Sequence, residues 1–229
     1  MVKKDAVRQG YDEVAVVHDE ERDDAGRGMA ILESFLDSVE DPARVLDAGC
    51  GSGRPVLRRL TEASDAVGLD ISGGQLRLAR ENAPGAGLLQ GDMTTLPFPD
   101  DSFEAVVAFW SLIHVPEDDH QAVLDEFARV LRPGGRALVC EAAEAWNGRN
   151  PDWLDEGVEM QWNMAGAATT RRQLVAAGFD VEAVWGAPTA LEWDRRTHSD
   201  DEGPDVEDEP DDADDDSPWT FFAARLGSQ

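Results

Sequence analysis

The chain has 229 residues, of which 41% are apolar, and this is enough to bury one hydrophobic core but not two. No apolar run approaches the roughly 18 residues that a membrane-spanning helix needs, and no apolar stretch follows the two lysines near the N-terminus. Cys50 and Cys140 are the only cysteines, which argues against a disulfide framework and excludes a metal site made of cysteines. We therefore expect a cytoplasmic protein with one core.

The net charge is −28, from 48 acidic and 20 basic residues, and only Lys3 and Lys4 among the basic residues are lysines. Residues 194–217 hold 13 acids and two arginines, so they carry −11 and the rest of the chain −17. Such an acidic protein repels itself in dilute buffer, whereas concentrated salt shortens the Debye length to a few ångströms. We interpret the charge as the adaptation of a halophilic microbe; a surface that binds basic partners is the alternative. Nucleic acid and anionic membranes are not expected as partners, because both would be repelled.

From residue 44 onward, short apolar runs typical of strands alternate with longer runs of helical periodicity. The predicted strands span residues 44–49, 65–71, 87–92, 103–110, 136–142, 180–187 and 219–226. The predicted helices span residues 53–63, 72–83, 118–131 and 169–179. This alternation predicts an α/β fold, with a doubly wound, mostly parallel sheet and helices on both of its faces.

Two segments interrupt the alternation. Residues 142–168 form an insert that holds three tryptophans and two methionines, namely Trp146, Trp153, Trp162, Met160 and Met164. Residues 194–217 are too polar and too charged to pack, so we expect an acidic loop between the last two strands.

A glycine turn, VLDAGCGSGR, follows the first predicted strand and contains Gly49, Gly51 and Gly53. A loop at the carboxyl end of a central parallel strand opens into the crevice where doubly wound folds bind ligands. Glycine permits positive φ there and lets a ligand lie against the backbone. The spacing is G-x-G-x-G and not the G-x-x-x-x-G-K-[ST] of an NTPase loop or the G-x-G-x-x-G of a dinucleotide fold.

Acidic residues recur at the ends of three predicted strands: Asp47, Asp70 and Asp92. Asp70 is placed to accept hydrogen bonds from both hydroxyls of a ribose, and Asp92 to accept one from an adenine amine, with Ile71 and Met93 on either side of the ring. No nearby lysine compensates these carboxylates, so a cationic adenosine ligand fits better than a pyrophosphate-bearing nucleotide. Taken singly, Asp47 could cap a helix and the other two could form turns.

Four motifs in order, VLDAGCGSGR, VGLDIS, GDMTTLPFPDDSFEAVVAFWSLIHV and LRPGGRALV, closely resemble those of class I S-adenosylmethionine-dependent methyltransferases. The resemblance is strong over residues 44–141. It implies a Rossmann-like, seven-stranded sheet whose last strand is antiparallel. It also implies an N-terminal helical lid over residues 1–40 and a cofactor-binding domain over residues 41–229, with S-adenosylhomocysteine as the product.

The resemblance further implies the positions of the cofactor. Its methionine part would face Asp47 and the glycine turn, its ribose Asp70, its adenine Ile71, Asp92 and Met93, and its amino group the backbone around Phe109. The residues that the resemblance assigns to the cofactor are Tyr11, Asp47, Gly49, Cys50, Gly51, Gly53, Asp70, Ile71, Asp92, Met93 and Phe109. Tyr11 would belong to the lid.

Methyl transfer from a sulfonium displaces an excellent leaving group, so alignment of the nucleophile supplies much of the catalysis. A base is needed only when the nucleophile arrives protonated. His114, in SLIHVP just past the fourth strand, is the candidate base. The alternative is a wall residue bonded to backbone. The other histidines, His18, His120 and His198, are expected at the surface.

The segment AFWSLIH lacks the D/N-P-P-Y/F signature of enzymes that methylate nucleobase or amide nitrogens, which also disfavours nucleic acid as the acceptor. The sequence therefore predicts a transferase for a small-molecule acceptor. The tryptophans of the insert form either an aromatic acceptor pocket or a small satellite core under a long loop.

Two alternatives to this function stay open. One is an NAD-type oxidoreductase, favoured by Asp70 lying about 20 residues beyond the turn. The other is a non-catalytic S-adenosylmethionine-binding protein that uses the insert or the acidic loop to bind a protein partner. Neither spacing nor composition indicates the acceptor, the atom that is methylated or the oligomeric state.

Overall fold

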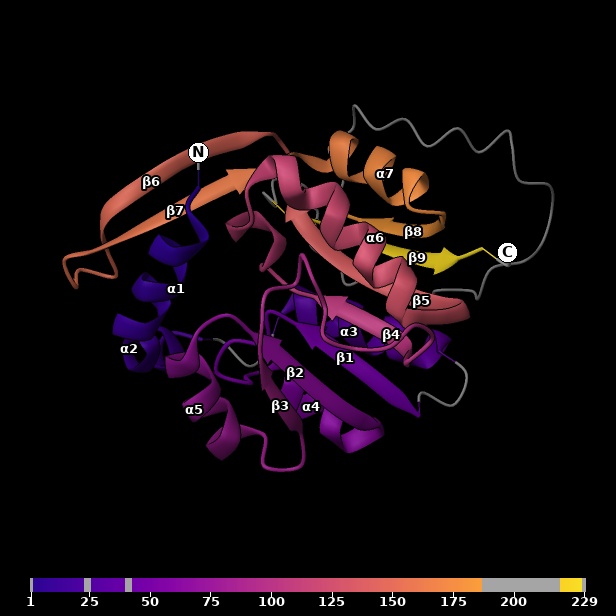
Figure 1. Cartoon of the computed structure of the whole chain (residues 1–229), viewed down its shortest axis with the longest axis horizontal. Helices are drawn as coiled ribbons and strands as arrows, with labels where there is room; N and C mark the ends of the chain where they lie inside the picture. Colours follow the sequence, from indigo (N-terminus) through magenta and orange to yellow (C-terminus); the bar gives the residue numbers. More distant parts are fainter. Residues whose placement is uncertain (1, 23–25, 40–42, 187–218, 228–229) are drawn as a thin grey trace.

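The computed structural model describes residues 2–22, 26–39, 43–186 and 219–227 (Figure 1). The predicted acidic loop, residues 194–217, and His198 lie outside the described residues. Within the described ranges, the chain forms a seven-stranded sheet and a separate two-stranded sheet. None of the helices in these ranges is long and apolar enough to cross a bilayer.

The seven-stranded sheet has the order β3-β2-β1-β4-β5-β9-β8. Its strands are β1 (Arg44–Ala48), β2 (Asp65–Asp70), β3 (Gly87–Gln90), β4 (Phe103–Ala108), β5 (Leu131–Ala142), β8 (Phe179–Trp185) and β9 (Trp219–Leu226). The strands β1 to β5 pair in parallel with one another, whereas β9 lies antiparallel between β5 and β8. The predicted fold class, including the antiparallel last strand, is confirmed.

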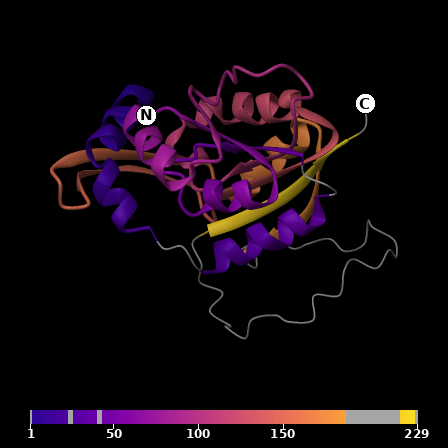
Figure 2. The ribbon, with the colours of Figure 1, turned by 90° about the horizontal axis from the view of Figure 1, so that it is seen from below.

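Helices cover both faces of this sheet (Figures 1 and 2). They are α3 (Arg27–Ser38), α4 (Val56–Ala63), α5 (Gly73–Asn82), α6 (His120–Val130) and α7 (Ala167–Ala176). In α6, Val123, Leu124, Phe127 and Val130 recur at helical spacing and are fully buried against one face of the sheet, beside α7. The other face is covered by α3, α4 and α5. Two cores of apolar side chains therefore hold the central strands.

The N-terminal segment adds α1 (Lys4–Glu13) and α2 (Ala15–Glu20), which lie beside α5. Ser72 caps α5, because its hydroxyl accepts a hydrogen bond from the backbone of Gln75 at 3.0 Å. Asp12 of α1 accepts hydrogen bonds from the Ser72 hydroxyl at 2.7 Å and from the Gly74 backbone at 2.8 Å. The carboxylate of α1 thus fixes this helix to the amino end of α5.

The insert folds into an antiparallel hairpin, β6 (Trp146–Trp153) and β7 (Val158–Met164), that lies along α1 (Figure 1). Met160 is fully buried there with Val7 of α1, and Trp153 and Trp162 are partly buried against this group. Trp146 differs, since it is 51% exposed. Trp153 and Trp162 therefore belong to a small satellite core, which is the second of the two alternatives for the insert. This core lies against α1 and not under a long loop.

Two predictions about histidine need correction. His120 was expected at the surface but is 0% exposed, because it is the first residue of α6 and faces the sheet. One of its ring nitrogens, Nε2, lies 3.0 Å from the carbonyl of Val115, and the other, Nδ1, lies 3.8 Å from the equally buried carboxyl of Glu141. His18, also expected at the surface, is half-buried under Tyr11 and Trp153. The centre of its ring lies 5.2 Å from that of Tyr11 and 5.3 Å from that of Trp153.

Candidate active site

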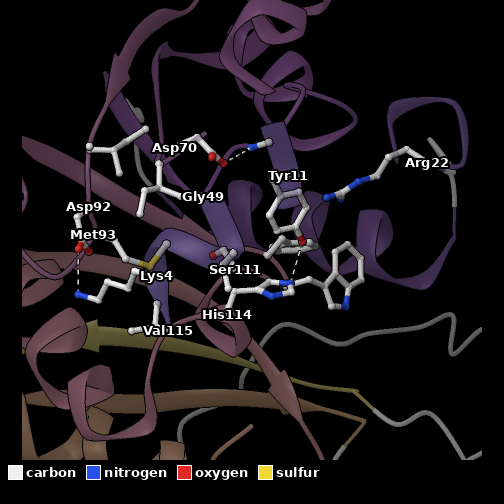
Figure 3. Close-up of a pocket in the computed structure, with 17 residues that line it drawn as sticks. Lys4, Tyr11, Arg22, Gly49, Asp70, Asp92, Met93, Ser111, His114 and Val115 are labelled. Atoms are coloured by element: carbon white, nitrogen blue, oxygen red, sulfur yellow. Dashed lines mark hydrogen bonds and ion pairs between the residues drawn. The ribbon is translucent and has the colours of Figure 1, made fainter. Parts of the chain in front are cut away.

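A pocket lies at the carboxyl ends of β1, β2 and β4, where the order of the strands reverses (Figure 3). It holds about 650 Å³ of empty space, part of which is continuous with solvent. The pocket brings together most of the predicted site residues: Tyr11, Gly49, Gly51, Asp70, Ile71, Asp92, Met93, Phe109 and His114. Three predicted residues, Asp47, Cys50 and Gly53, do not line it.

The glycine turn adopts the backbone conformation that its sequence predicts, with φ of 82° at Gly49, 54° at Gly51 and 83° at Gly53. A Cβ at Gly49 would overlap the side chain of Ser111, whose hydroxyl donates to the carbonyl of Ala48 at 2.7 Å. A Cβ at Gly51 would meet nothing closer than 3.7 Å, so this backbone is open to the pocket. Gly53 instead packs against α5.

The Asp70 carboxylate is fixed at the edge of the pocket by two backbone hydrogen bonds. Its Oδ2 accepts from Gly51 and its Oδ1 from Ser72, both at 2.8 Å. Burial raises the pKa of Asp70, while these two hydrogen bonds and the charge of Arg22 oppose the rise. Each oxygen keeps a lone pair that can accept a further hydrogen bond.

Asp47 and Cys50 lie beneath the glycine turn. Asp47 is 1% exposed, and its Oδ2 has no hydrogen-bond partner among the described residues. Burial, together with the neighbouring Asp70, raises the pKa of Asp47 to about 8, so the free protein holds this group largely protonated at neutral pH. Cys50 is buried against Gly68 of β2, and burial raises its pKa well above the usual thiol value. Cys50 therefore has a packing role here.

Asp92 is paired with a lysine, contrary to the expectation that no lysine compensates it. The Lys4 ammonium lies 2.9 Å from Oδ2 of Asp92 and 3.2 Å from Asp119, and donates to the Thr94 hydroxyl at 2.8 Å. Burial opposes ionisation of Asp92, but the hydrogen bonds from Thr94 and Lys4 outweigh it and lower its pKa. Local sequence could not reveal this contact, because 88 residues separate the partners.

A second cation, Arg22, also lines the pocket and was not predicted. It follows α2, and its Nη2 lies 3.7 Å from the point where a Cβ of Gly51 would be (Figure 3). Its charge acts on several pocket groups, since it lowers the pKa of Asp47 and of His114. No motif surrounds Arg22 in the sequence, so only the docking of the N-terminal segment reveals it.

Tyr11 and His114 form a directed hydrogen-bonded pair. The Tyr11 hydroxyl lies 2.8 Å from Nε2 of His114, and Nδ1 of His114 lies 3.0 Å from the carbonyl of Gln161 on β7. A carbonyl only accepts, so Nδ1 carries the proton and Nε2 accepts from Tyr11. Burial, assisted by Arg22, lowers the pKa of His114 to about 4, and burial raises that of Tyr11. Both groups are therefore neutral at pH 7.

The geometry of His114 is compatible with both roles considered for it, the catalytic base and the wall residue. The imidazole is bonded to backbone, as the wall-residue alternative requires, yet its other nitrogen reaches the pocket through a titratable hydroxyl. No group of three histidine, cysteine or carboxylate side chains that could hold a metal occurs in the part of the chain that the structure describes.

Comparison with known proteins shows which enzymes this chain is similar to. Residues 46–139 match the family model described as a methyltransferase domain. The chain is 42% identical over 127 residues to the methyltransferase GfsG of Streptomyces halstedii, and 32% identical over 173 residues to the sterol 24-C-methyltransferase erg6 of Aspergillus fumigatus. These matches cover 51% and 68% of this chain but 45% of each relative, so the chain spans less than half of their length.

Among solved structures, the DhpI–SAH complex superposes with a TM-score of 0.70 and covers 99% of this chain and 98% of its own, at 19% identity. At this identity the likeness shows the fold, which is the Rossmann-like fold of methyltransferases. Residues 46–139 are therefore similar to a methyltransferase domain, within a chain that has the fold of such enzymes. The predicted fold is confirmed, and the predicted methyltransferase class agrees with the family match.

Proposed function

We propose that this protein transfers the methyl group of S-adenosylmethionine to a small-molecule acceptor. The observation that carries the proposal is the open backbone at Gly51, flanked by the fixed carboxylate of Asp70 and the guanidinium of Arg22, at the switch point of the sheet. GfsG and erg6 are named as methyltransferases, and the second name specifies a sterol as the acceptor, which supports a small molecule here.

The residues present fit such a cofactor. Asp70 has free lone pairs for the ribose hydroxyls, and Ile71 and Met93 offer apolar contacts to the adenine. Arg22 can pair with the carboxylate of the methionine part, a contact that guanidinium makes with two hydrogen bonds. Asp47 is buried below the turn with an unsatisfied oxygen, and it supplies negative potential to the sulfonium and ammonium groups once their arrival ionises it. The cofactor supplies the activated methyl group.

The chain's own contribution to the chemistry is alignment and a path for a proton. Tyr11 and His114 lie on one side of the pocket, with the Tyr11 proton directed at Nε2. An acceptor with a protonated nucleophile can donate to the Tyr11 oxygen while Tyr11 passes its own proton to His114. His114 then acts as the base through Tyr11, and the Gln161 carbonyl stabilises the imidazolium.

The domain assignment remains part of this proposal. Residues 1–40 act as the lid, since Lys4, Tyr11 and Arg22 all reach the pocket from there. The insert, residues 142–168, lies near the acceptor side, because Gln161 holds His114 and the Trp162 ring lies 5.9 Å from the His114 ring. The acidic composition supports a halophilic origin, and a cytoplasmic location stays part of the same proposal.

Calorimetry in molar potassium chloride tests the proposal, with S-adenosylmethionine and S-adenosylhomocysteine as separate titrants and NADH as the control. Binding of both adenosine ligands and not of NADH is expected. Transfer of an isotopically labelled methyl group to a panel of small molecules then tests turnover. A chain that binds neither adenosine ligand lacks the proposed function, whereas binding without turnover across the panel favours the non-catalytic alternative.

A further inference from the structure

A second cleft lies at the amino ends of the parallel strands, on the opposite side of the sheet from the first pocket. Figure 1 shows this end of the sheet, where β5 begins and β9 ends. It holds about 750 Å³ of empty space, including its open mouth. Three arginines line it, Arg132, Arg136 and Arg225, together with Glu104, the Pro133–Gly135 turn and the end of α3. Such a group of cations is unexpected in a chain with 48 acidic and 20 basic residues.

Two of these arginines face each other directly. In the antiparallel pairing of β5 with β9, Arg136 is opposite Arg225, so the two side chains share one face of the sheet. Like charges in directly opposite positions destabilise a strand pair. The two guanidinium groups therefore each favour an anion beside them: Arg136 has one in Glu182, whereas Arg225 has none among the described residues.

The three guanidinium groups differ in their partners. Arg132 is paired with Glu104, and Arg136 is paired with Glu182 of β8 at 2.9 Å. The Arg225 guanidinium makes no hydrogen bond or ion pair with any described residue, although Asp180 is its register neighbour on β8. Its five N–H donors are therefore available.

The turn beside Arg225 leaves room for a ligand. Gly134 has a φ of 79°, and a Cβ there would come within 3.4 Å of Nη2 of Arg225. The guanidinium consequently lies over bare backbone, where a side chain would otherwise crowd it.

We propose that this cleft binds a small oxyanion, a carboxylate or phosphate group, with Arg225 as its principal ligand and Arg136 beside it. A guanidinium presents two parallel donors that match two oxygens of either group. The bound anion neutralises the charge of Arg225 on β9, as Glu182 does that of Arg136 on β5. The site is at the amino ends of the parallel strands and is independent of the proposed function.

Thermal unfolding of the full chain at constant ionic strength tests this, as potassium phosphate or potassium acetate progressively replaces potassium chloride. We expect a saturable rise in the melting temperature with phosphate, acetate or both, which identifies the preferred oxyanion. Arg225→Gln should abolish this rise, while its melting temperature in chloride alone is equal to or above that of the parent, because one of two opposed charges is gone. Arg172→Gln, an exposed arginine of α7, is the matched control and should keep the full response.

Arg225→Lys separates charge from geometry. It keeps the cation but loses the paired donors, so the anion concentration at half-saturation should increase about tenfold. The proposal is wrong if phosphate and acetate stabilise no more than chloride, or if Arg225→Gln and Arg225→Lys both respond as the parent does. A fall in the melting temperature of Arg225→Gln in chloride, with the oxyanion response intact, would assign Arg225 a packing role instead.

Discussion

The Tyr11 hydroxyl donates a hydrogen bond to Nε2 of His114 over 2.8 Å, although 103 residues separate the two side chains. The pair joins α1 to the segment after β4, and the Gln161 carbonyl extends it to the hairpin. Because the carbonyl fixes the tautomer of His114, the proton of Tyr11 has one direction in which to move.

The first prediction concerns the titration of His114. Its pKa of about 4 lies below the usual value of 6.5. Between pH 4 and pH 6.5, His114 is therefore protonated in the unfolded chain but neutral in the folded chain. Stability should therefore fall as the pH drops from 6.5 towards 4. Urea unfolding at pH 7 and pH 5 should show a pH effect that is smaller in His114→Gln by roughly 1–2 kcal/mol. An NMR midpoint for His114 near 6.5 would contradict the buried, neutral state.

The second prediction concerns Tyr11→Phe, which keeps the ring and removes the hydroxyl. We expect methyl transfer to a protonated nucleophile to slow by about 10- to 100-fold, because the path to His114 is broken. Affinity for S-adenosylhomocysteine should change by less than about threefold, since the ring packing remains. The comparison of turnover with binding separates the two effects. An equal loss in both would mean that the hydroxyl serves the cofactor and not the proton.

The third prediction concerns Arg22. If its guanidinium pairs with the carboxylate of the cofactor, Arg22→Gln should weaken S-adenosylhomocysteine binding by about tenfold or more, measured by calorimetry. Arg27, exposed at the start of α3, provides the matched control, because Arg27→Gln makes the same change of charge away from the pocket. Similar losses in both variants would show a general effect of net charge and no specific contact.

The fourth prediction uses the buried carboxyl of Asp47. With a pKa of about 8, it is mostly protonated at pH 7, and the arrival of a sulfonium and an ammonium group should ionise it. S-adenosylmethionine should then release about one proton on binding, seen as a dependence of the calorimetric enthalpy on the ionisation enthalpy of the buffer. Asp47→Asn should release markedly less, and S-adenosylhomocysteine, which lacks the sulfonium, should release less than S-adenosylmethionine from the parent protein.

The same shift has a consequence for the free protein. Asp47 keeps its proton longer in the folded chain than in the unfolded one, where the pKa is near 3.8. Stability contributed by this group is therefore lost as the pH rises from about 4 to 8, and Asp47→Asn should remove that part of the pH dependence.

The fifth prediction follows from the net charge of −28. Weak screening leaves the acidic groups to repel one another, so partial unfolding is expected below roughly 0.5 M salt. Circular dichroism during dialysis from molar salt into dilute buffer provides the measurement. An unchanged spectrum would count against a halophilic origin, while S-adenosylhomocysteine binding could still be tested separately.

Much of the sheet follows from the sequence because its signals are local. The apolar run of β4 and the last strand, β9, have the predicted type, and β9 has the predicted bounds. In contrast, β5 begins at Leu131 and not at residue 136, since the Pro133–Gly135 turn is absorbed by an irregularity in the pairing with β4. The proline and glycines of this turn suggested that the strand starts after them, but a bulge in the pairing with β4 lets β5 continue through them.

The hairpin and the pocket's cations could not be predicted in this way. The strand β6 contains Gly148 and Pro151, which disfavour strands, and its pairing with β7 beside α1 is a tertiary effect. Lys4 and Arg22 reach the pocket through the docking of α1 and α2. The motifs identified the carboxylates at the strand ends, but the cations beside them, Lys4 and Arg22, lie far from these motifs in the sequence.

Neither α1 nor the β6–β7 hairpin contributes a strand to the seven-stranded sheet, yet both supply contacts around His114. Their length and side chains can consequently be exchanged without altering any hydrogen bond of that sheet. Replacing the hairpin could therefore change which molecules the pocket admits, while Gly51 and Asp70, which the proposed function assigns to the methyl donor, keep their positions at the strand ends.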